Sequence, residues 1–419
     1  MFLQIIYIGA ITNLAITLLL YRRQFHTIKQ SKVPKYLQEK ISNEEYAKTK
    51  KYNSEKIIFS IIQILFNSIL TFAKIYYNIL PILYNKLDEG LQLKSELLTQ
   101  IIFLTLNSLF DTIFHLPFSV YSTFVIEEKW GFNKTTAYVF ITDLIKGFLL
   151  MSLIMPIIFT IIYQIIQYFV TFYLYVSLFL FVFQIAMAII YPILIMPMFN
   201  KFEEMQDGSL KEKVVELTKK VKFAYSNIFV MDGSKRSGHS NAFFIGLFGE
   251  RRIVFFDTLL EQTEENETVA ILAHELGHWY YMHTWRGILF SSLYQAVSFY
   301  FFEIAVKNKN FSISLFGTEK VPLLLKLIYF SMVSSMIAPL MVLLANMFSR
   351  YNERQADLFA IQNGYAEDLA KGLIALYAEN RAPLETDWMY STYYHSHPTL
   401  NERISFINEY KQVYEKKEE

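Results

Sequence analysis

The sequence predicts a multispanning α-helical membrane protein with polar excursions, and three observations lead to that fold class. Of 419 residues, 53% are hydrophobic and only 18% are charged, whereas an ordinary soluble domain is nearer a quarter charged. Seven stretches approach the roughly 20 mostly apolar residues that a helix needs to cross a bilayer. The polar residues gather mainly in two regions, Lys201–Arg286 and Ser349–Glu419.

The charge balance and the residue types exclude several classes of protein. Lys plus Arg number 39 and Asp plus Glu number 38, so the net charge of +1 indicates no nucleic-acid partner. The chain has no cysteine, which excludes disulfides, thiolate zinc fingers, iron–sulfur clusters and a cysteine nucleophile. The high hydrophobicity also excludes a disordered chain. A folded protein whose main partner is the lipid bilayer remains.

The seven predicted spans follow one another along the whole chain. The first has no basic segment before it and no small-residue cleavage site after it, so we interpret it as an anchor rather than a cleaved signal peptide. The fourth and fifth share one apolar tract with a turn near Gln167–Thr171. In order, the spans are Phe2–Leu20, Ile57–Leu83, Leu97–Phe118, two helices within Phe148–Met198, Ile288–Val306 and Val321–Met347.

Ionisable residues also occur at membrane depth. Asp111 and His115 lie within the third span, and Asp143 and Lys146 lie at the edge of the fourth. Because such residues usually face the interior of a helix bundle or a watery space, we expect all four to line an internal cavity.

The Lys/Arg bias of short loops predicts the orientation in the membrane. The segment Arg22–Lys51, expected to be a loop, holds nine Lys or Arg against three Glu and is therefore predicted to be cytosolic. The N-terminus then lies on the far side, and seven spans return the C-terminus to the cytosol. Both polar regions consequently face the same compartment, where their side chains can meet.

The first polar region mixes helix and strand patterns. An amphipathic helix is expected over Leu210–Lys222. Three short β-like runs follow, separated by turns rich in Gly and Ser, which is typical of a small β-meander. Cap-type residues near Thr263–Asn266 then begin a helix that runs through Met282. The three runs are Ile228–Met231, Asn241–Leu247 and Arg252–Phe256.

That helix carries His274-Glu275-x-x-His278. Histidines four residues apart project from one helix face, one turn apart, so both can bind one zinc ion at about 2 Å. Glu275 lies beside that position and can take a proton from the activated water. The alternative is a helix that carries these residues by chance, which is uncommon for so specific a motif.

A second helix offers a third ligand. Glu353 and Asp357 are four residues apart and share a helix face, and Ala356 and Ala360 form a small-residue surface for close approach. A catalytic zinc takes three protein ligands, for which His₂Glu is a standard set. We therefore predict Glu353 as the third ligand of one zinc per chain, with Asp357 orienting a ligand histidine. A solvated acidic helix face is the alternative.

These motifs resemble those of the type 1 CAAX prenyl proteases, integral-membrane zinc endopeptidases that include the a-factor-converting enzymes. The resemblance covers nearly the whole chain in family order and is most specific from Asn241 to Arg403; the early spans agree mainly in number and layout. It rests on Asn241-Ala242-Phe243, Arg252 through Leu260, the histidine motif, Ser349-Arg350 through Asp357, His397-Pro398 and Arg403. The fold implied is about seven transmembrane helices with a cytosolic zincin-like metalloprotease domain containing a small β-meander.

The resemblance implies further roles for individual residues. Asn241, Ala242 and Phe243 would bind substrate as a strand added to a sheet edge, a mode that suits extended peptides. His397 and Arg403 would complete the catalytic site by stabilising the oxyanion or binding the substrate carboxylate. Without the family, Asn241 could equally be a turn residue, and His397 and Arg403 surface residues. His283 lies on another face than the motif and is expected to be structural or interfacial.

The activity implied is removal of the last three residues of prenylated CAAX proteins by zinc-activated water attack, with Glu275 as general base. No oligomer is required for it. The first alternative is a quality-control zinc metalloprotease acting on unprenylated membrane proteins. The second is a non-catalytic membrane protein that retains the motif, against which the intact Glu275 counts.

The expected domains and location follow from the same features. Residues 1–198 form spans one to five with the cytosolic loop 22–51, residues 199–286 the catalytic region, residues 287–348 spans six and seven, and residues 349–419 the cytosolic C-terminal region. Lys416 and Lys417 resemble a dilysine retrieval signal, and the family also implies the endoplasmic reticulum membrane. A solvated charged tail is the alternative for these lysines.

Overall fold

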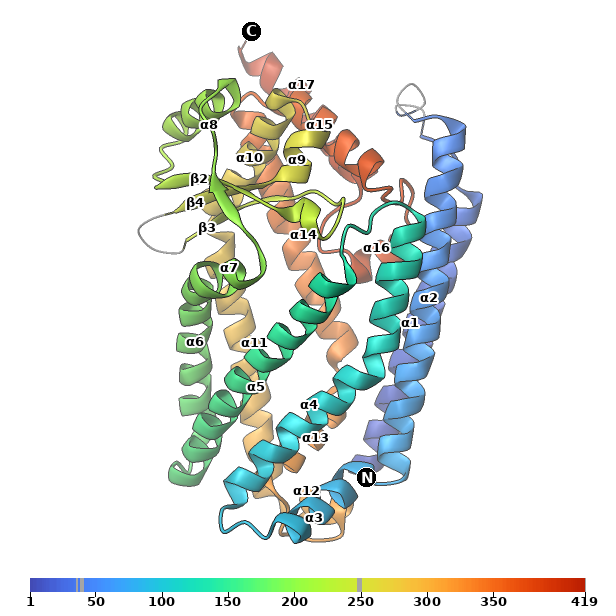
Figure 1. The fold of residues 1–419 in the computed structure, drawn as a ribbon, viewed down its shortest axis with the longest axis vertical. Coiled ribbons are helices and arrows are strands. Elements are labelled where there is room, and N and C mark those ends of the chain that lie inside the picture. Colours follow the sequence, from blue (N-terminus) through green and yellow to red (C-terminus); the bar gives the residue numbers. More distant parts are fainter. Residues whose placement is uncertain (35–36, 38–40, 247–250, 419) are drawn as a thin grey trace.

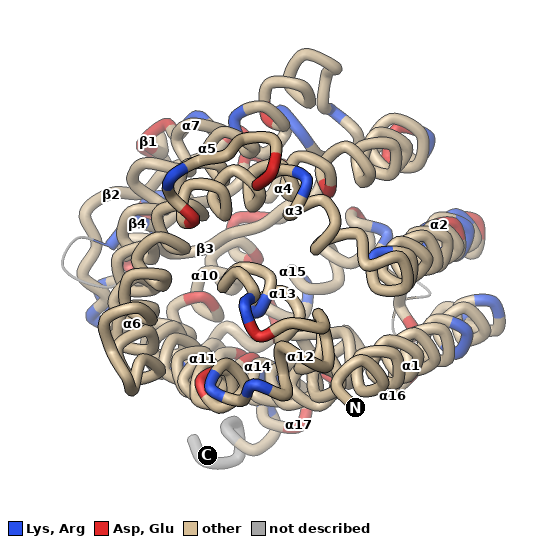
Figure 2. Tube along the Cα trace, turned by 90° about the horizontal axis from the view of Figure 1, so that it is seen from below, with Lys and Arg blue, Asp and Glu red and all other residues tan. Residues whose placement is uncertain are grey.

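The computed structural model describes residues 1–34, 37, 41–246 and 251–418, with side chains to residue 413. Long helices run side by side, and the sheet and shorter helices lie together at one end of them (Figure 1). The N-terminus lies at the opposite end from the C-terminus, as an odd number of crossings requires. Seen from below, the helices surround a common centre (Figure 2).

Six helices are long and apolar enough to cross a membrane, and a bent pair makes up to seven. The membrane part comprises α1 (Phe2–Gln30), α2 (Asn43–Tyr76), α3 (Ile79–Leu91), α4 (Glu96–Tyr121) with the π-helix η2 (Ser122–Glu127), α5 (Ala137–Tyr168), α6 (Phe172–Ile190), η3 (Tyr191–Ile195), α7 (Met196–Phe199), α11 (His283–Lys307), α12 (Lys309–Phe316), α13 (Leu323–Ser334) and α14 (Ala338–Gln362).

Two predicted boundaries are wrong. The segment Arg22–Lys51 is mostly helical, because α1 continues to Gln30 and α2 begins at Asn43; residues 35–36 and 38–40 lie outside the described part. The second span does not run to Leu83. Helix α2 ends at Tyr76 and Asn78 is left-handed, with φ 50°. Pro81 explains the break, since its ring would clash with the carbonyl four residues earlier.

The last predicted span is bent by 72° between α13 and α14. Pro339 at the first turn of α14 lacks the N–H that would continue α13 as one helix. The lower part of α14 therefore reaches down toward α13, while its upper part enters the end that holds the sheet and the shorter helices (Figure 1). Gly364, with φ 89°, ends this helix as a left-handed cap.

The polar end contains one small sheet and eight helices that carry or flank the motifs. Its elements are β1 (Phe202–Glu204), α8 (Ser209–Lys220), β2 (Asn227–Met231), the short 3₁₀ helix η4 (Gly233–Lys235), β3 (Ala242–Ile245), β4 (Arg252–Phe256), α9 (Asp257–Gln262), α10 (Glu265–Tyr280), α15 (Ala366–Glu379), α16 (Trp388–Tyr394) and α17 (Leu400–Glu418), joined by the upper part of α14.

The sheet is not a meander. Its order is β1-β2-β4-β3, with β2 parallel to β4 and β3 antiparallel to β4. Strand β4 takes the interior position because Ile253, Val254 and Phe255 are fully buried. Strand β3 is left at an edge. Each of the three predicted runs contains a strand, but β3 is shorter than predicted, because Asn241 and Gly246 lie outside it. Leu247 lies outside the described residues. Strand β1, with three residues, was not predicted.

Helices α10 and α14 approach very closely at Gly277. A Cβ on Gly277 would lie 2.8 Å from the Ala356 Cα, and Ala356 and Ala360 are fully buried beside it. The two motifs, 75 residues apart at their nearest ligands, therefore come together because small residues face each other across this crossing.

We expect Gly277→Ala to destabilise the protein by about 1–3 kcal/mol, because overpacking forces the two helices apart. The affinity for a metal ion should fall together with the stability, because the predicted ligands lie on both helices. The matched control is Gly287→Ala in α11, where nothing lies within 4 Å of the added Cβ. Thermal unfolding in detergent measures the effect. Equal unfolding temperatures for the two variants would contradict the close crossing.

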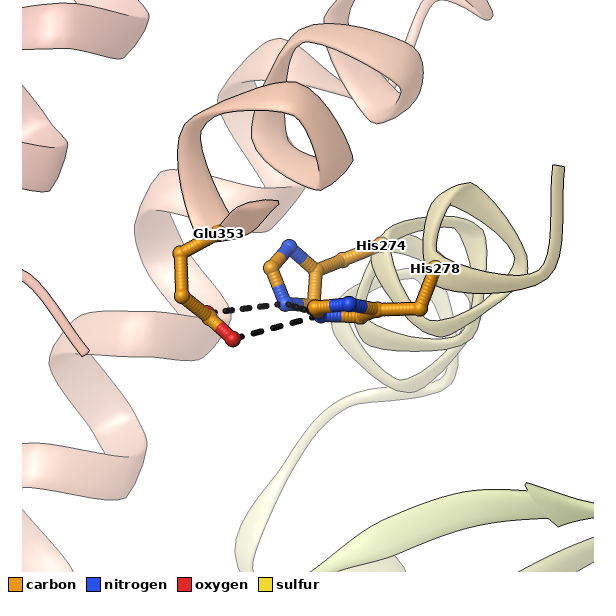
Figure 3. A group of neighbouring side chains, drawn as sticks. All are labelled: His274, His278 and Glu353. Carbon is orange, nitrogen blue, oxygen red and sulfur yellow. Dashed lines mark hydrogen bonds and ion pairs between the residues drawn. The ribbon is translucent and has the colours of Figure 1, made fainter. Parts of the chain in front are cut away.

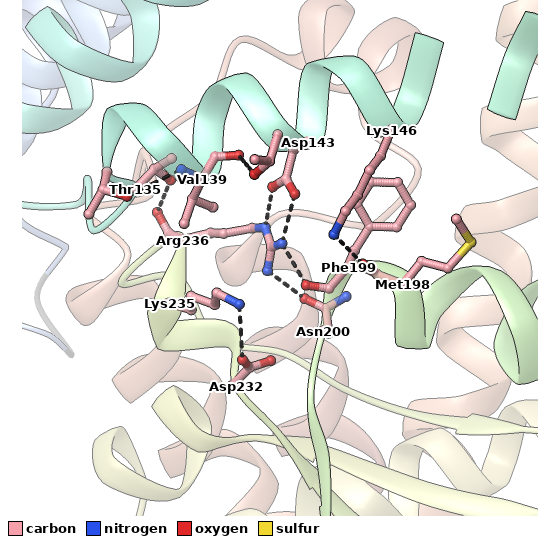
Figure 4. Close-up of polar contacts among 12 residues, drawn as sticks. Thr135, Val139, Asp143, Lys146, Met198, Phe199, Asn200, Asp232, Lys235 and Arg236 are labelled. Atoms are coloured by element: carbon pink, nitrogen blue, oxygen red, sulfur yellow. Dashed lines mark hydrogen bonds and ion pairs between the residues drawn. The ribbon is translucent and has the colours of Figure 1, made fainter. Parts of the chain in front are cut away.

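A polar network joins the polar end to the membrane helices (Figure 4). Arg236, after η4, donates through Nε to Asp143 Oδ2 on α5 at 2.7 Å, and through Nη1 to Asn200 Oδ1 at 3.0 Å. Lys146 donates to the Met198 carbonyl at 2.8 Å. Asp143 and Lys146 line a cavity of about 640 Å³, and Asp111 and His115 line a separate one of about 460 Å³.

Candidate metal centre

Helix α10 presents the two motif histidines on one face. Its first turn is fixed by a capping box between Glu264 and Glu267, which satisfies free N–H groups at the helix start. His274 is buried and His278 is partly exposed. Their Nε2 atoms lie 3.2 Å apart, so both imidazoles turn the same nitrogen toward one point.

Helix α14 places Glu353 opposite that point (Figure 3). Its Oε2 lies 3.4 Å from His274 Nε2, and its Oε1 lies 3.3 Å from His278 Nε2. One ligand atom from each of the three residues lies within 4.8 Å of the others. The structure thus brings together the three residues predicted as ligands, from helices far apart in the sequence.

This arrangement fits a cation. Glu353 Oε2 is buried and makes no hydrogen bond of good geometry with a described residue, although His274 Nε2 and His397 Nδ1 lie 3.4 and 2.8 Å from it. A buried carboxylate oxygen gains from a partner that saturates it. Burial and Arg403 would lower the pKa of His274, but hydrogen bonds with Asp357 and Glu353 raise it to about 9. The surroundings therefore favour positive charge here, and two imidazoles with one carboxylate are a common zinc donor set.

Glu275 follows the first histidine and is partly buried. It is not one of the converging ligand atoms. Burial raises the pKa of its carboxyl group, while the neighbouring histidines act in the opposite direction. A raised pKa brings a carboxylate closer to the value that suits a general base near neutral pH.

Asp357 and Arg403 form a buried pair behind His274. Asp357 Oδ1 lies 2.8 Å from His274 Nδ1, and Arg403 donates through Nε to Asp357 Oδ2 at 3.0 Å and through Nη2 to Oδ1. The carboxylate of Asp357 can thereby hold the proton on Nδ1 and leave Nε2 free for a metal. Arg403, predicted to be catalytic, contacts the orienting carboxylate and His274 Nδ1, which makes it a positioning residue in this structure.

His397 approaches the site from the loop before α17. Its Nδ1 lies 2.8 Å from Glu353 Oε2, and its side chain is 60% exposed. Arg350 steadies this loop by donating to the His397 carbonyl at 3.1 Å and to Glu402. His397 is therefore at the open side of the centre, where a donor could meet a bound peptide.

His283 is a neighbour of the centre that sequence reasoning placed elsewhere. Its Nδ1 lies 2.9 Å from His278 Nδ1, and its Nε2 lies 3.1 Å from Gln355 Oε1, which also accepts from Arg286. The sequence predicted that His283 lies on another face than the motif, and so did not reveal its contact with His278. The chain turns at Met282, whose left-handed φ of 57° begins α11, and that turn brings His283 back to the motif.

The predicted substrate strand lies against the motif helix. Helix α10 packs on β3, whose outer edge carries no other described strand. Asn241 immediately precedes β3; its carbonyl accepts from Phe256 N at 3.0 Å, and its side chain accepts from Ala242 N at 2.9 Å. Ala242 is buried, and Phe243 packs edge-on against Phe256. An unpaired strand edge beside the metal ligands can accept an extended peptide.

Comparisons with known proteins agree with this geometry. Residues 24–201 match the family model described as CAAX prenyl protease N-terminal, five membrane helices, and residues 204–411 match peptidase family M48. A CAAX prenyl protease 1 homolog of Arabidopsis thaliana is 38% identical, with 92% of both chains covered. CAAX prenyl protease 1 of Saccharomyces cerevisiae is 35% identical over 92% of this chain and 90% of its own. The crystal structure of S. mikatae Ste24p superposes with a TM-score of 0.91 at 36% identity, covering 97% of this chain and 98% of that one.

Proposed function

The chain belongs to the CAAX prenyl proteases of peptidase family M48 and is a membrane-embedded metalloprotease, and from this premise we propose that it is a zinc endopeptidase that removes the last three residues of prenylated CAAX proteins. The observation that carries the proposal is the convergence of His274, His278 and Glu353, with Glu275 beside them and an open strand edge alongside. One zinc ion per chain would be held by these three residues.

When bound, zinc would supply a Lewis acid that polarises the scissile carbonyl and makes water more acidic. Glu275 accepts the proton of the attacking water and later delivers it to the leaving amine. Asp357 keeps His274 in the tautomer that presents Nε2, and Arg403 holds Asp357. His397 stands on the open side and donates toward the oxyanion that develops on the substrate.

The substrate would be held as an extended strand along β3. Asn241 and Phe243 direct their main-chain groups toward β4, so the N–H and C=O of Ala242 point to the free edge. Main-chain hydrogen bonds there do not depend on side-chain identity, which suits a peptide of varied sequence. The site lies at the end of the membrane helices (Figure 1), so a lipid-modified cysteine can stay in an apolar environment while the peptide reaches polar groups. Relatives named CAAX prenyl protease support this substrate class.

The test is a cleavage assay on one CAAX peptide in farnesylated and unprenylated form, with zinc measured on the same sample. We expect release of the C-terminal tripeptide from the farnesylated peptide at a much higher kcat/KM, and about one zinc per chain. Equal cleavage of both peptides would favour the alternative of a quality-control protease. Zinc-loaded protein without activity on either peptide would contradict both.

We further propose that the protein resides in the endoplasmic reticulum membrane with its active site and C-terminus in the cytosol. The basic segment at the peptidase end of α1 and α2 supports this orientation. Lys416 and Lys417 lie in the last turns of α17, and their role in retrieval stays a prediction.

Orientation can be tested by cysteine labelling, because the chain has no cysteine of its own. Lys219 in α8 and Lys320 before α13 are exposed and lie at opposite ends. In sealed microsomes with the cytosolic side outward, we expect an impermeant maleimide to label Lys219→Cys at once and Lys320→Cys only after detergent. The reverse pattern would place the active site in the lumen. The chain also has glycosylation sequons at Asn266-Glu267-Thr268 and Asn310-Phe311-Ser312. A glycan on Asn266, rather than on Asn310, would likewise place the active site in the lumen.

A further inference from the structure

A pocket of about 1150 Å³ lies where α1 ends, α2 begins and α4 passes into η2, away from the metal centre. We call it the interfacial pocket. One end is basic, and the other is apolar and aromatic. It is lined by Lys29, Ser31, Lys32, Val33, Asn43, Tyr46, Ala47, Lys50, Lys51, Ser54, Glu55, Ile58, Phe59, Ile62, Pro117, Phe118, Tyr121 and Ile126.

The basic end carries positive charge that pairs with no acid among the described residues. Lys29, Lys32 and Lys51 are exposed and form no ion pair with another described residue. Lys50 donates to the carbonyls of Lys29 and Ser31 at 2.7 and 3.0 Å, and so places its charge among the others. These four cations crowd one mouth and therefore favour an anion there.

Glu55, the one acid among the described lining residues, already has partners. Glu55 Oε2 accepts from Lys129 Nζ at 2.8 Å and from Trp130 Nε1 at 2.9 Å. These bonds hold Glu55 on the α4 side of the pocket, so it pairs with none of the four lysines at the opening.

The pocket opens outward, toward lipid. On α2, Lys51, Ile58 and Ile62 share one helix face, and Ile58 and Ile62 are 48% and 53% exposed. The opposite face carries Asn53, which donates to the Arg381 carbonyl, and Lys74, which pairs with Asp111. Since polar residues at membrane depth face the bundle interior, the face with the isoleucines looks into the bilayer.

The geometry points to a binding site for an anionic phospholipid in this pocket. The lysines would hold the phosphate and the acidic headgroup, and the isoleucines with Phe59, Phe118 and Tyr121 would pack the upper acyl chains. Clusters of about four or more basic residues at the end of a membrane helix attract anionic lipids of the cytosolic leaflet. A free inorganic or nucleotide phosphate would leave the apolar half of the pocket empty, whereas a lipid fills both halves.

The experiment is native mass spectrometry of the full-length protein released from nanodiscs that contain phosphatidylcholine with or without phosphatidylserine. We expect one phosphatidylserine to be retained in preference to phosphatidylcholine. At about fivefold per lysine, the variant K29Q/K32Q/K51Q should lower that preference on the order of a hundredfold. The charge-matched control K86Q/K94Q/K320Q changes exposed lysines at the other end and should retain it.

A second variant and a second probe test the apolar half. Ile62→Trp fills the pocket without changing charge and should also reduce phosphatidylserine retention. Soluble glycerophosphoserine, which lacks acyl chains, should not compete with the lipid. Peptidase activity close to wild type in the lysine variant would show that it is folded, since none of its residues contacts the metal centre. Equal lipid preference in the two triple variants, or effective competition by glycerophosphoserine, would overturn the proposal.

Discussion

Glu275→Gln is expected to lower peptidase activity by about 10²–10⁴-fold while the zinc content stays that of the wild type. Glutamine fills the same space but cannot accept a proton from the attacking water. The three converging ligand atoms come from other residues, so the metal should remain. Activity on a farnesylated peptide and zinc by atomic emission, measured on one preparation, test both halves of the expectation.

Two further variants make that result specific. Glu353→Gln removes a ligand carboxylate and should lose both zinc and activity. Glu261→Gln changes an exposed acid at the end of α9, outside the site, and should change neither. Loss of zinc in Glu275→Gln would make Glu275 a ligand, and retained zinc with retained activity would remove it from the mechanism.

Local sequence was enough to predict the long apolar helices, the helices that carry the two motifs and the spacing of the histidines. A four-residue spacing on α10 places both imidazoles on one face whatever surrounds the helix. Glu353 could be predicted because a zinc needs a third ligand and α14 offers an acid beside small residues. The span positions followed from apolar length, and errors arose where Pro81 and Pro339 interrupt continuous apolar stretches.

Contacts that depend on how distant segments pack could not be predicted in the same way. The sequence order of the strands suggested a meander, but burial of β4 on both sides places it between β2 and β3. Arg403 looked like a residue that meets substrate, yet a packing of α17 on α14 brings it to Asp357. His283 reaches His278 because the backbone is left-handed at Met282. Glycine or asparagine would have indicated such a turn in the sequence, but methionine does not.

Asp357→Ala is expected to lower the free energy of unfolding by about 3–5 kcal/mol, because it leaves the buried Arg403 without a partner. Arg403 is 8% exposed, and a guanidinium cannot give up its charge. The same variant should weaken zinc binding by roughly 10–100-fold, since His274 Nδ1 loses the carboxylate that orients it. Thermal unfolding and zinc competition with a chelator measure the two effects separately.

The double variant Asp357→Leu/Arg403→Met distinguishes the two roles of the pair. Replacing both members of a buried ion pair by apolar residues is often neutral for stability, so most of the lost stability should return. Zinc affinity should stay low, because leucine cannot accept the hydrogen bond from His274 Nδ1. If the double variant were as unstable as Asp357→Ala, the unpaired arginine would not be the cause. If it bound zinc as the wild type does, Asp357 would not be the residue that orients His274.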